Sequence, residues 1–191
     1  MATDVMRREF RIAGFGGQGV VLSGQIIGKA AAIYDKGFAA MSQNYGPEAR
    51  GGSCTAEVVI SRETIDYPYV VCPQVLIILA QEAYNKYGHD IPSETLLIID
   101  PSLVTPDPSQ NSVPLSVPAT IMAREMGRSV VANIIVLGFL AAVSDLISPE
   151  ALRESVLVSV PEGTGEFNLK AFDLGYQYGM EHGRHSNDTS G

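Results

Sequence analysis

Residues 8–29 read REFRIAGFGGQGVVLSGQIIGK, and this order of residue types predicts a strand, a glycine turn and a helix. The apolar run at residues 10–13 is typical of a short strand, and the apolar residues after position 19 recur at helical spacing. The turn between them, GFGGQG, fits the pattern G-x-G-x-x-G. Such a turn lets a phosphate or carboxylate approach bare backbone and the N–H groups of a helix start. A turn that only packs helix against strand is the alternative interpretation.

Length, composition and charge limit the class of protein. The chain has 191 residues, 46% of them hydrophobic and 18% charged, which suits one globular domain with its own core. We expect this domain to span residues 1–183 and a polar, disordered tail to follow at residues 184–191. The net charge of −8 argues against binding to nucleic acid or to acidic membranes.

The metal-binding residue types are sparse in this sequence. Cys54 and Cys72 are too few for an iron–sulfur cluster, which takes about four thiolates, and they form no zinc pattern. We therefore predict no metal site and no catalytic residue in this chain.

No signal peptide is recognisable, and the longest apolar run, residues 134–143, is too short to cross a bilayer. A cytoplasmic protein with reduced thiols is the expectation.

Strand-like and helix-like segments alternate along the chain. Residues 75–80 and 95–99 are continuous apolar runs, which is typical of strands buried on both faces. The predicted helices are residues 20–29, 81–87, 119–126, 150–158 and 167–183, with a further helical stretch from residue 129. In the last of them Phe172, Tyr176 and Met180 recur at four-residue spacing. This alternation predicts an α/β fold, a Rossmann-like three-layer αβα domain with a mostly parallel sheet, to which residues 37–61 can add an antiparallel hairpin.

A second glycine-rich segment follows the second predicted strand, residues 37–41. Residues 42–53 read SQNYGPEARGGS and are predicted to form a loop. A guanidinium at Arg50 beside the open backbone of two glycines suits a clamp on a carboxylate or phosphate, and Glu48 could orient it or bind a partner. A surface ion pair beside a tight turn is the alternative. If the first two strands are neighbours in a parallel sheet, both glycine turns lie at its carboxyl edge and line one crevice.

A nicotinamide-binding site is disfavoured. Such a site needs an acidic residue about 20 residues after the glycines, at the end of the second strand. That strand ends near Met41 and Ser42, and Asp35 precedes it. A stand-alone Rossmann-like module that binds a nucleotide nevertheless remains an alternative function.

Taken together, the motifs resemble those of the gamma subunit of 2-oxoacid:ferredoxin oxidoreductases. The resemblance runs from about residue 10 to residue 140 and rests on residues 14–19, 28–29, 45–52 and 57–61. The form SQNYGPEARGG is most similar to the branch of the family that uses 2-oxoglutarate. Pyruvate and branched-chain 2-oxoacids are the alternative substrates.

The resemblance implies a complex that oxidatively decarboxylates 2-oxoglutarate to succinyl-CoA and passes electrons to ferredoxin. Thiamine diphosphate, magnesium and iron–sulfur clusters belong to other subunits, and this chain alone binds none of them and is inactive. Its implied partners are the alpha and beta subunits, with delta as a further candidate, and it helps to close the coenzyme A side of the active site. Whether the isolated chain forms a homodimer stays open.

The predicted cofactor-binding residues come from three motifs. By position, residues 14–19 match the family's first motif, residues 45–52 its second, and Asn133, at a helix start, a third. The residues are Gly14, Gly16, Gly17, Gln18, Gly19, Tyr45, Gly46, Glu48, Arg50, Gly51, Gly52 and Asn133. We expect Arg50 and the N–H groups of residues 16–19 to contact coenzyme A phosphates or an acidic group of a neighbouring subunit.

Overall fold

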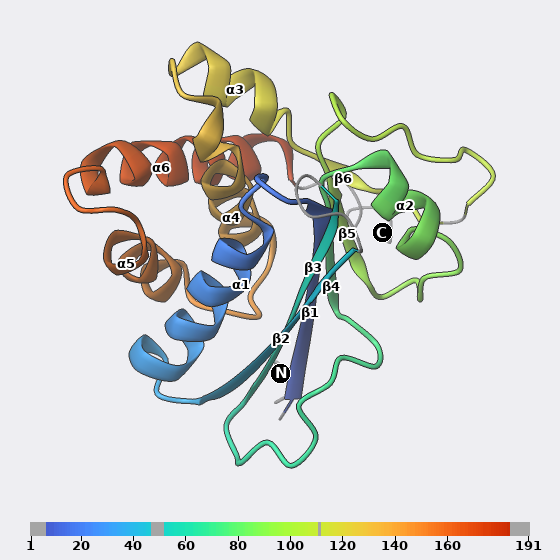
Figure 1. The fold of residues 1–191 in the computed structure, drawn as a ribbon, viewed down its shortest axis with the longest axis horizontal. Helices are drawn as coiled ribbons and strands as arrows, with labels where there is room; N and C mark the ends of the chain where they lie inside the picture. The colour runs from blue at the N-terminus through green and yellow to red at the C-terminus, as the bar shows by residue number, and fades with distance from the viewer. Residues whose placement is uncertain (1–6, 47–51, 111, 184–191) are drawn as a thin grey trace, which may run out of the picture.

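The computed structural model describes residues 7–46, 52–110 and 112–183, and within them one sheet lies between two layers of helices (Figure 1). The strands of this part of the chain are β1 (Arg7–Phe15), β2 (Phe38–Tyr45), β3 (Ser53–Ser61), β4 (Val75–Ile78), β5 (Leu96–Ile99) and β6 (Leu115–Ser116). Their order across the sheet is β2-β3-β1-β4-β5-β6. Strands β1, β4, β5 and β6 are parallel, and β3 is antiparallel to both of its neighbours. The predicted α/β fold, with its antiparallel hairpin of β2 and β3, is confirmed.

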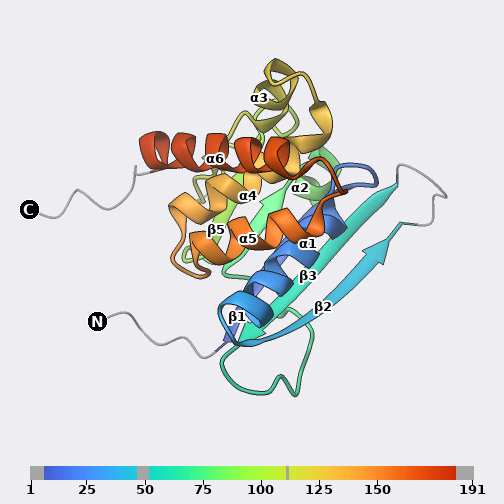
Figure 2. The ribbon, with the colours of Figure 1, turned by 90° about the vertical axis from the view of Figure 1, so that its left-hand side faces the viewer.

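Helices cover the two faces of the sheet unequally. The helices of the described residues are α1 (Val20–Lys29), α2 (Gln81–Tyr87), α3 (Ala119–Glu125), α4 (Ala132–Val143), α5 (Pro149–Ser159) and α6 (Gly165–His182). Helix α2 lies on one side of the sheet, and the other helices gather on the opposite side (Figures 1 and 2). The larger core therefore lies between the sheet and α1, α4, α5 and α6, and a smaller core lies under α2.

The first two strands are not neighbours, so the condition on which we expected both glycine turns to share one edge does not hold. Strand β3 lies between them, and its apolar residues, such as Val58 and Val59, are fully buried, as is typical of a central strand covered on both faces. Strand β2 takes the edge of the sheet, where the polar side chains of residues 42–44 remain accessible. Since β1 and β2 are both antiparallel to β3, they run in the same direction. Their carboxyl ends still lie at one edge of the sheet.

The second strand is longer than its sequence indicates. Residues 42–45, predicted as part of a loop, continue β2 and pair with residues 54–57 of β3. Polar side chains are tolerated there because an edge strand is open to water. The glycine-rich loop therefore starts at Gly46.

Two short irregular helices flank the regular ones. The π-helix η1 (Ala30–Tyr34) extends α1, and the 3-10 helix η2 (Ser129–Val131) leads into α4. Helix α4 is buried on nearly all sides at the centre of the larger core. None of the helices in the described ranges combines the length and apolar character needed to cross a membrane.

Candidate functional site

The two glycine turns meet at the carboxyl edge of the sheet. The N–H of Gly16 donates a 2.9 Å hydrogen bond to the carbonyl oxygen of Gly52, and the N–H of Gly46 donates a 2.7 Å bond to the carbonyl of Ser53. Gly16 and Gly17 are exposed, so this edge is open to a ligand or another chain. We call residues 16–19, 46 and 52 the glycine edge. The expectation that both turns lie at one edge is confirmed, although β3 separates the strands that precede them.

The start of helix α1 presents open backbone N–H groups at the glycine edge. Gly19 is the N-cap residue with a φ of 73°, and Gly17 has a φ of 97°, conformations that favour glycine. Within the described residues, no side chain caps this helix. The first N–H groups of a helix have no partner inside it, and they carry the positive end of the helix dipole. A phosphate or carboxylate can therefore bind directly to this backbone.

The crevice beside this turn is a topological switch point. Strand β1 leads into α1 on one side of the sheet, whereas its parallel neighbour β4 leads into α2 on the other side (Figure 1). Ligands of open α/β sheets bind where neighbouring strands diverge in this way. The sequence predicted the turn, and the structure adds β4 as the second wall of the crevice.

Gln18 closes the floor of this crevice with its side-chain amide. Its Oε1 accepts a 2.6 Å bond from the N–H of Phe15, and its Nε2 donates a 2.6 Å bond to the carbonyl of Leu79, at the end of β4. Gly14 lies buried beneath, where a Cβ would come within 2.5 Å of that Oε1. Both predicted residues therefore hold the shape of the turn through contacts within the chain.

Asn133 ties the starts of α1 and α4 together. Its Nδ2 donates to the carbonyl of Gly19 and to Oγ of Ser23, each at 3.4 Å, and the hydroxyl of Ser23 donates to the same carbonyl at 2.9 Å. A Cβ on Gly19 would lie only 2.4 Å from Nδ2 of Asn133. Gly19 of the first predicted motif thus contacts Asn133 of the third, and sequence spacing alone did not indicate this contact.

A cavity of about 190 Å³ opens beside Gly17, Gln18 and Asn133. Leu79, Leu103, Val130 and Val136 give it apolar walls, and Thr120 and Ser129 add polar groups. These residues come from strand ends and helix starts that are distant in sequence. Only the fold brings these wall residues together with Gly17, Gln18 and Asn133, so the sequence analysis did not identify the wall residues. An apolar cavity next to a turn with open N–H groups has the form that suits a ligand with a charged group and an apolar arm.

Asp100 is a buried carboxylate that directly follows β5, and the sequence analysis did not single it out. It lines the cavity and is 1% exposed. Its Oδ1 accepts a 2.8 Å bond from the N–H of Ser102, and its Oδ2 accepts a 2.7 Å bond from the N–H of Thr120. The carboxylate therefore anchors the start of α3 and shapes the cavity wall.

Of the remaining predicted site residues, the structure describes Tyr45 but not the three charged or glycine residues that follow Gly46. Tyr45, at the end of β2, is 63% exposed. Glu48, Arg50 and Gly51 lie outside the described residues. In the described ranges, no three or more His, Cys, Asp or Glu side chains gather as a metal site would require.

These features define a Rossmann-like domain whose glycine edge is open to the outside. Residues 9–178 match the model of the pyruvate ferredoxin/flavodoxin oxidoreductase family, and the chain therefore belongs to this family.

Individual relatives agree with this assignment. The chain is 45% identical over 179 residues to the 2-oxoglutarate synthase subunit KorC of Methanocaldococcus jannaschii, covering 92% of this chain and 96% of the relative. The keto/oxoacid ferredoxin oxidoreductase gamma subunit of Geobacter sulfurreducens has a similar structure, with a TM-score of 0.82 and 39% identity over 92% of this chain and 98% of that chain. The resemblance to gamma subunits is confirmed.

A larger protein contains the same fold. The 2-oxoglutarate:ferredoxin oxidoreductase of Magnetococcus marinus, solved with 2-oxoglutarate, coenzyme A and succinyl-CoA bound, matches with a TM-score of 0.82 and 26% identity. The match covers 92% of this chain and 31% of that chain. In that protein, then, the fold forms one part of a longer polypeptide.

Proposed function

We propose that this chain is the gamma subunit of a 2-oxoglutarate:ferredoxin oxidoreductase, which converts 2-oxoglutarate and coenzyme A to succinyl-CoA and passes electrons to ferredoxin. The observation that carries this proposal is the glycine edge, held together by the bond between Gly16 and Gly52, in a chain 45% identical to a 2-oxoglutarate synthase subunit. The segment SQNYGPEARGG, similar to the 2-oxoglutarate branch, supports this substrate over pyruvate and branched-chain 2-oxoacids. A stand-alone nucleotide-binding function is not favoured.

The chain's own contribution is to bind and enclose coenzyme A at the glycine edge. Coenzyme A carries phosphate groups and a long arm that is mostly uncharged. The bare N–H groups at the start of α1 and the guanidinium of Arg50 fit the phosphates, and the 190 Å³ cavity beside Gly17 fits part of the arm. An acidic group of a neighbouring subunit is the other anion that this edge fits.

Chemistry at the reacting carbon belongs to other subunits in this proposal. The alpha and beta subunits, with delta as a further candidate, would carry thiamine diphosphate, magnesium and the iron–sulfur clusters. The cysteines of this chain, Cys54 and Cys72, are both free thiols, which suits a reducing cytoplasm. On this view the isolated chain has no activity.

Arg50→Ala tests the role of the glycine edge in the reconstituted complex. We expect the variant to raise the apparent KM for coenzyme A about tenfold, or to weaken assembly, because one charge-assisted contact is lost. Circular dichroism of the isolated chain should be unchanged. Arg153→Ala is the matched control, because Arg153 forms an exposed ion pair with Asp173 away from this edge. Unchanged kinetics and assembly in Arg50→Ala would contradict the proposal.

Affinity capture from native extract tests the partners and the substrate. The tagged chain should recover subunits that bind thiamine diphosphate, and the complex should reduce ferredoxin faster with 2-oxoglutarate than with pyruvate or branched-chain 2-oxoacids. Tight binding of NAD by the isolated chain, with no such partners recovered, would favour the nucleotide-binding alternative.

A further inference from the structure

The outer edge of the sheet is a strand without the usual protection. Within the described residues, β2 pairs with β3 on one side only and forms the rim of the sheet (Figure 2). The pairing runs from Phe38 to Tyr45 without a bulge. The sequence of the strand, FAAMSQNY, contains no charged residue and no proline. Charges, prolines and bulges are what normally keep an edge strand from pairing with another chain, so this edge is open to a further strand.

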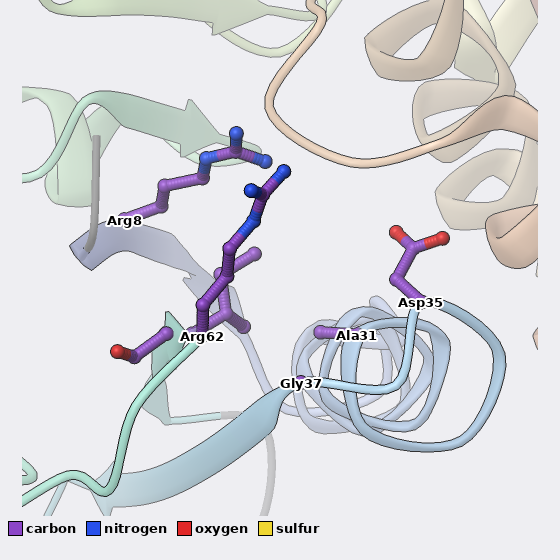
Figure 3. Close-up of a pocket in the computed structure, with 7 residues that line it drawn as sticks. Arg8, Ala31, Asp35, Gly37 and Arg62 are labelled. Carbon is purple, nitrogen blue, oxygen red and sulfur yellow. The ribbon is translucent and has the colours of Figure 1, made fainter. Parts of the chain in front are cut away.

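The turn that leads into β2 fixes where the strand begins. The N–H of Gly37 donates a 2.9 Å bond to the carbonyl of Ala31, and a Cβ on Gly37 would lie 2.8 Å from the carbonyl oxygen of Ser61, at the end of β3. Figure 3 shows this turn at one wall of a pocket of about 230 Å³ that Arg8 and Arg62 also line. The edge strand is therefore ordered before any partner binds, which lowers the entropy cost of pairing.

A groove of about 440 Å³ runs beside β2, on the face of the sheet that α1 covers. Its lining includes the small residues Gly24, Gly28 and Ala32 and the apolar side chains of Ile33 and Met41. A Cβ on Gly24 would lie 2.8 Å from Cε of Met41, so this methionine lies against α1. Ile33 is 61% exposed. The groove thus adds an apolar surface next to the unpaired edge.

This surface carries no acidic side chain, although the whole chain is acidic. The net charge is −8, from 21 acidic and 13 basic residues. Among the described residues of β2 and of the groove lining, the one charged side chain is Lys29, whose Nζ donates a 3.0 Å bond to Oγ of Ser159. Two copies of an acidic chain repel one another. A face without acids is therefore where two copies can approach most closely.

Two-fold symmetry restricts how β2 can pair with its own copy. Opposite residues of an antiparallel pair lie on the same face of the sheet, so in a symmetric pair their numbers add to an even number. Placing Met41 opposite Met41 of the second copy pairs Ala39 with Gln43 and Ala40 with Ser42. A register centred on Ser42 would place Met41 opposite Gln43 instead. Because apolar side chains pair best with each other, the register centred on Met41 is favoured.

We propose that β2 and the groove beside it form the interface of a homodimer, in which the two β2 strands pair antiparallel about a two-fold axis at Met41. The two six-stranded sheets then form one continuous sheet, and the outward N–H and C=O groups of each edge strand gain partners. The two grooves meet around the axis. This dimer does not depend on the oxidoreductase assignment, because it rests on the edge strand and the groove alone.

Light scattering of the full chain at micromolar concentration tests the interface. We expect the parent to have twice the mass of one chain. Met41→Lys should raise the dissociation constant at least about tenfold, because it places two like charges opposite each other at the axis. Gln177→Lys adds the same charge at an exposed position of α6 and should stay dimeric. A parent that is monomeric even at its highest soluble concentration, or a Met41→Lys variant as dimeric as the parent, overturns the proposal.

Cysteine cross-linking locates the axis without adding a charge, so it decides the question even if Met41→Lys folds poorly. In a Cys72→Ser background, Met41→Cys should form a disulfide between two chains on mild oxidation, because opposite residues of an antiparallel pair have Cα atoms about 4.5–5.5 Å apart. Gln43→Cys is the matched control. In the proposed register it lies four residues from its copy along the paired strands, more than about 13 Å away, and should not cross-link.

The same Met41→Cys disulfide should form when the chain is assembled into the complex with its other subunits. A disulfide from Gln43→Cys in place of Met41→Cys would show a different register. A cross-link from Met41→Cys to another subunit would show that a different chain covers β2. Either result, or no cross-link at all, contradicts the proposed dimer.

Discussion

The N–H of Gly16 lies 2.9 Å from the carbonyl oxygen of Gly52, and this hydrogen bond joins two glycine turns that are far apart in sequence. The register of β1 and β3, which places Phe15 opposite Ser53, makes the contact possible. The bond leaves Gly16 fixed while Gly17 next to it remains exposed. The bond therefore orders this backbone in the absence of a ligand, and a preformed site has a lower entropy cost of binding.

Gly19→Ala should destabilise the chain more than Gly17→Ala. Both glycines have positive φ values, 73° and 97°, which cost an L-residue about 1–2 kcal/mol. Only at Gly19 would the new Cβ meet another group, Nδ2 of Asn133 at 2.4 Å. Urea unfolding should show losses of about 2–4 kcal/mol for Gly19→Ala and about 1–2 kcal/mol for Gly17→Ala. Equal losses would mean that the contact with Asn133 is not tight.

Gln18→Ala should lower the free energy of unfolding by about 1–3 kcal/mol, since it leaves two backbone groups without their partners. These groups are the N–H of Phe15 and the carbonyl of Leu79, both 2.6 Å from the side-chain amide. Gln177→Ala is the matched control, because it removes an exposed 3.0 Å bond to Glu181 and should change stability by less than about 0.5 kcal/mol. If both variants unfold alike in urea, Gln18 does not join the ends of β1 and β4.

Local patterns in the sequence predicted the parts of the fold that depend on neighbours along the chain. The strand, turn and helix at residues 7–29 are such a case, because apolar spacing and glycines specify them within one short stretch. The continuous apolar runs of β4 and β5 likewise indicated buried parallel strands. The location of both glycine turns at one edge of the sheet could be predicted, because the helix that connects β1 to β2 lets the two strands run in the same direction.

Contacts between distant segments could not be predicted in this way. The place of β3 between β1 and β2 depends on which strand buries both faces, and single-sequence spacing does not determine it. The bridge made by Gln18 to Leu79 and the pocket of Arg8 and Arg62 each join segments separated by many residues. Arg50, the charged residue of the second motif, lies outside the described residues, and its contact with an anion stays a prediction.

Helix α6 shows how side-chain spacing can mislead. Phe172 is buried, but Met180, on the same predicted stripe, is 45% exposed. The close contact with α4 is instead made through Gly175 and Gly179, which are buried. Small residues give a weak hydrophobic signal, although they allow two helices to approach most closely.

Gly175→Ala should therefore destabilise the chain strongly. A Cβ at this position would lie 1.9 Å from the backbone carbonyl oxygen of Ile135 in α4, and the backbone cannot move aside as a flexible side chain can. We expect a loss of about 3 kcal/mol or more in the free energy of unfolding, measured by urea denaturation.

Gly28→Ala is the matched helical control. Gly28 lies in α1, and its new Cβ would make ordinary contacts with Ala39 and Val58 at 3.8 and 3.9 Å. Because alanine favours the helix, this variant should gain about 0.5–1 kcal/mol. A loss in Gly28→Ala similar to that in Gly175→Ala would show that the crossing of α4 and α6 is not the cause.

The two cysteines should differ sharply in reactivity. Cys54 lies buried in β3, and burial raises the pKa of its thiol, whereas Cys72 is exposed. One thiol per folded chain should therefore react quickly with a colorimetric thiol reagent at pH 8, and the second should react only after unfolding. Cys72→Ser should abolish the fast phase, and Cys54→Ala should retain it.

The same shift gives stability a pH dependence of defined sign. Because the folded-state pKa of Cys54 lies above its unfolded value of about 8.5, the unfolded chain loses this proton first as the pH rises. The contribution of Cys54 to stability is complete below that pH and declines above it. Urea unfolding of the parent and of Cys54→Ala between pH 7 and pH 10 should show a steeper decline in the parent, since the variant lacks the titrating group. Parallel curves would mean that the Cys54 thiol ionises as easily in the folded chain as in the unfolded one.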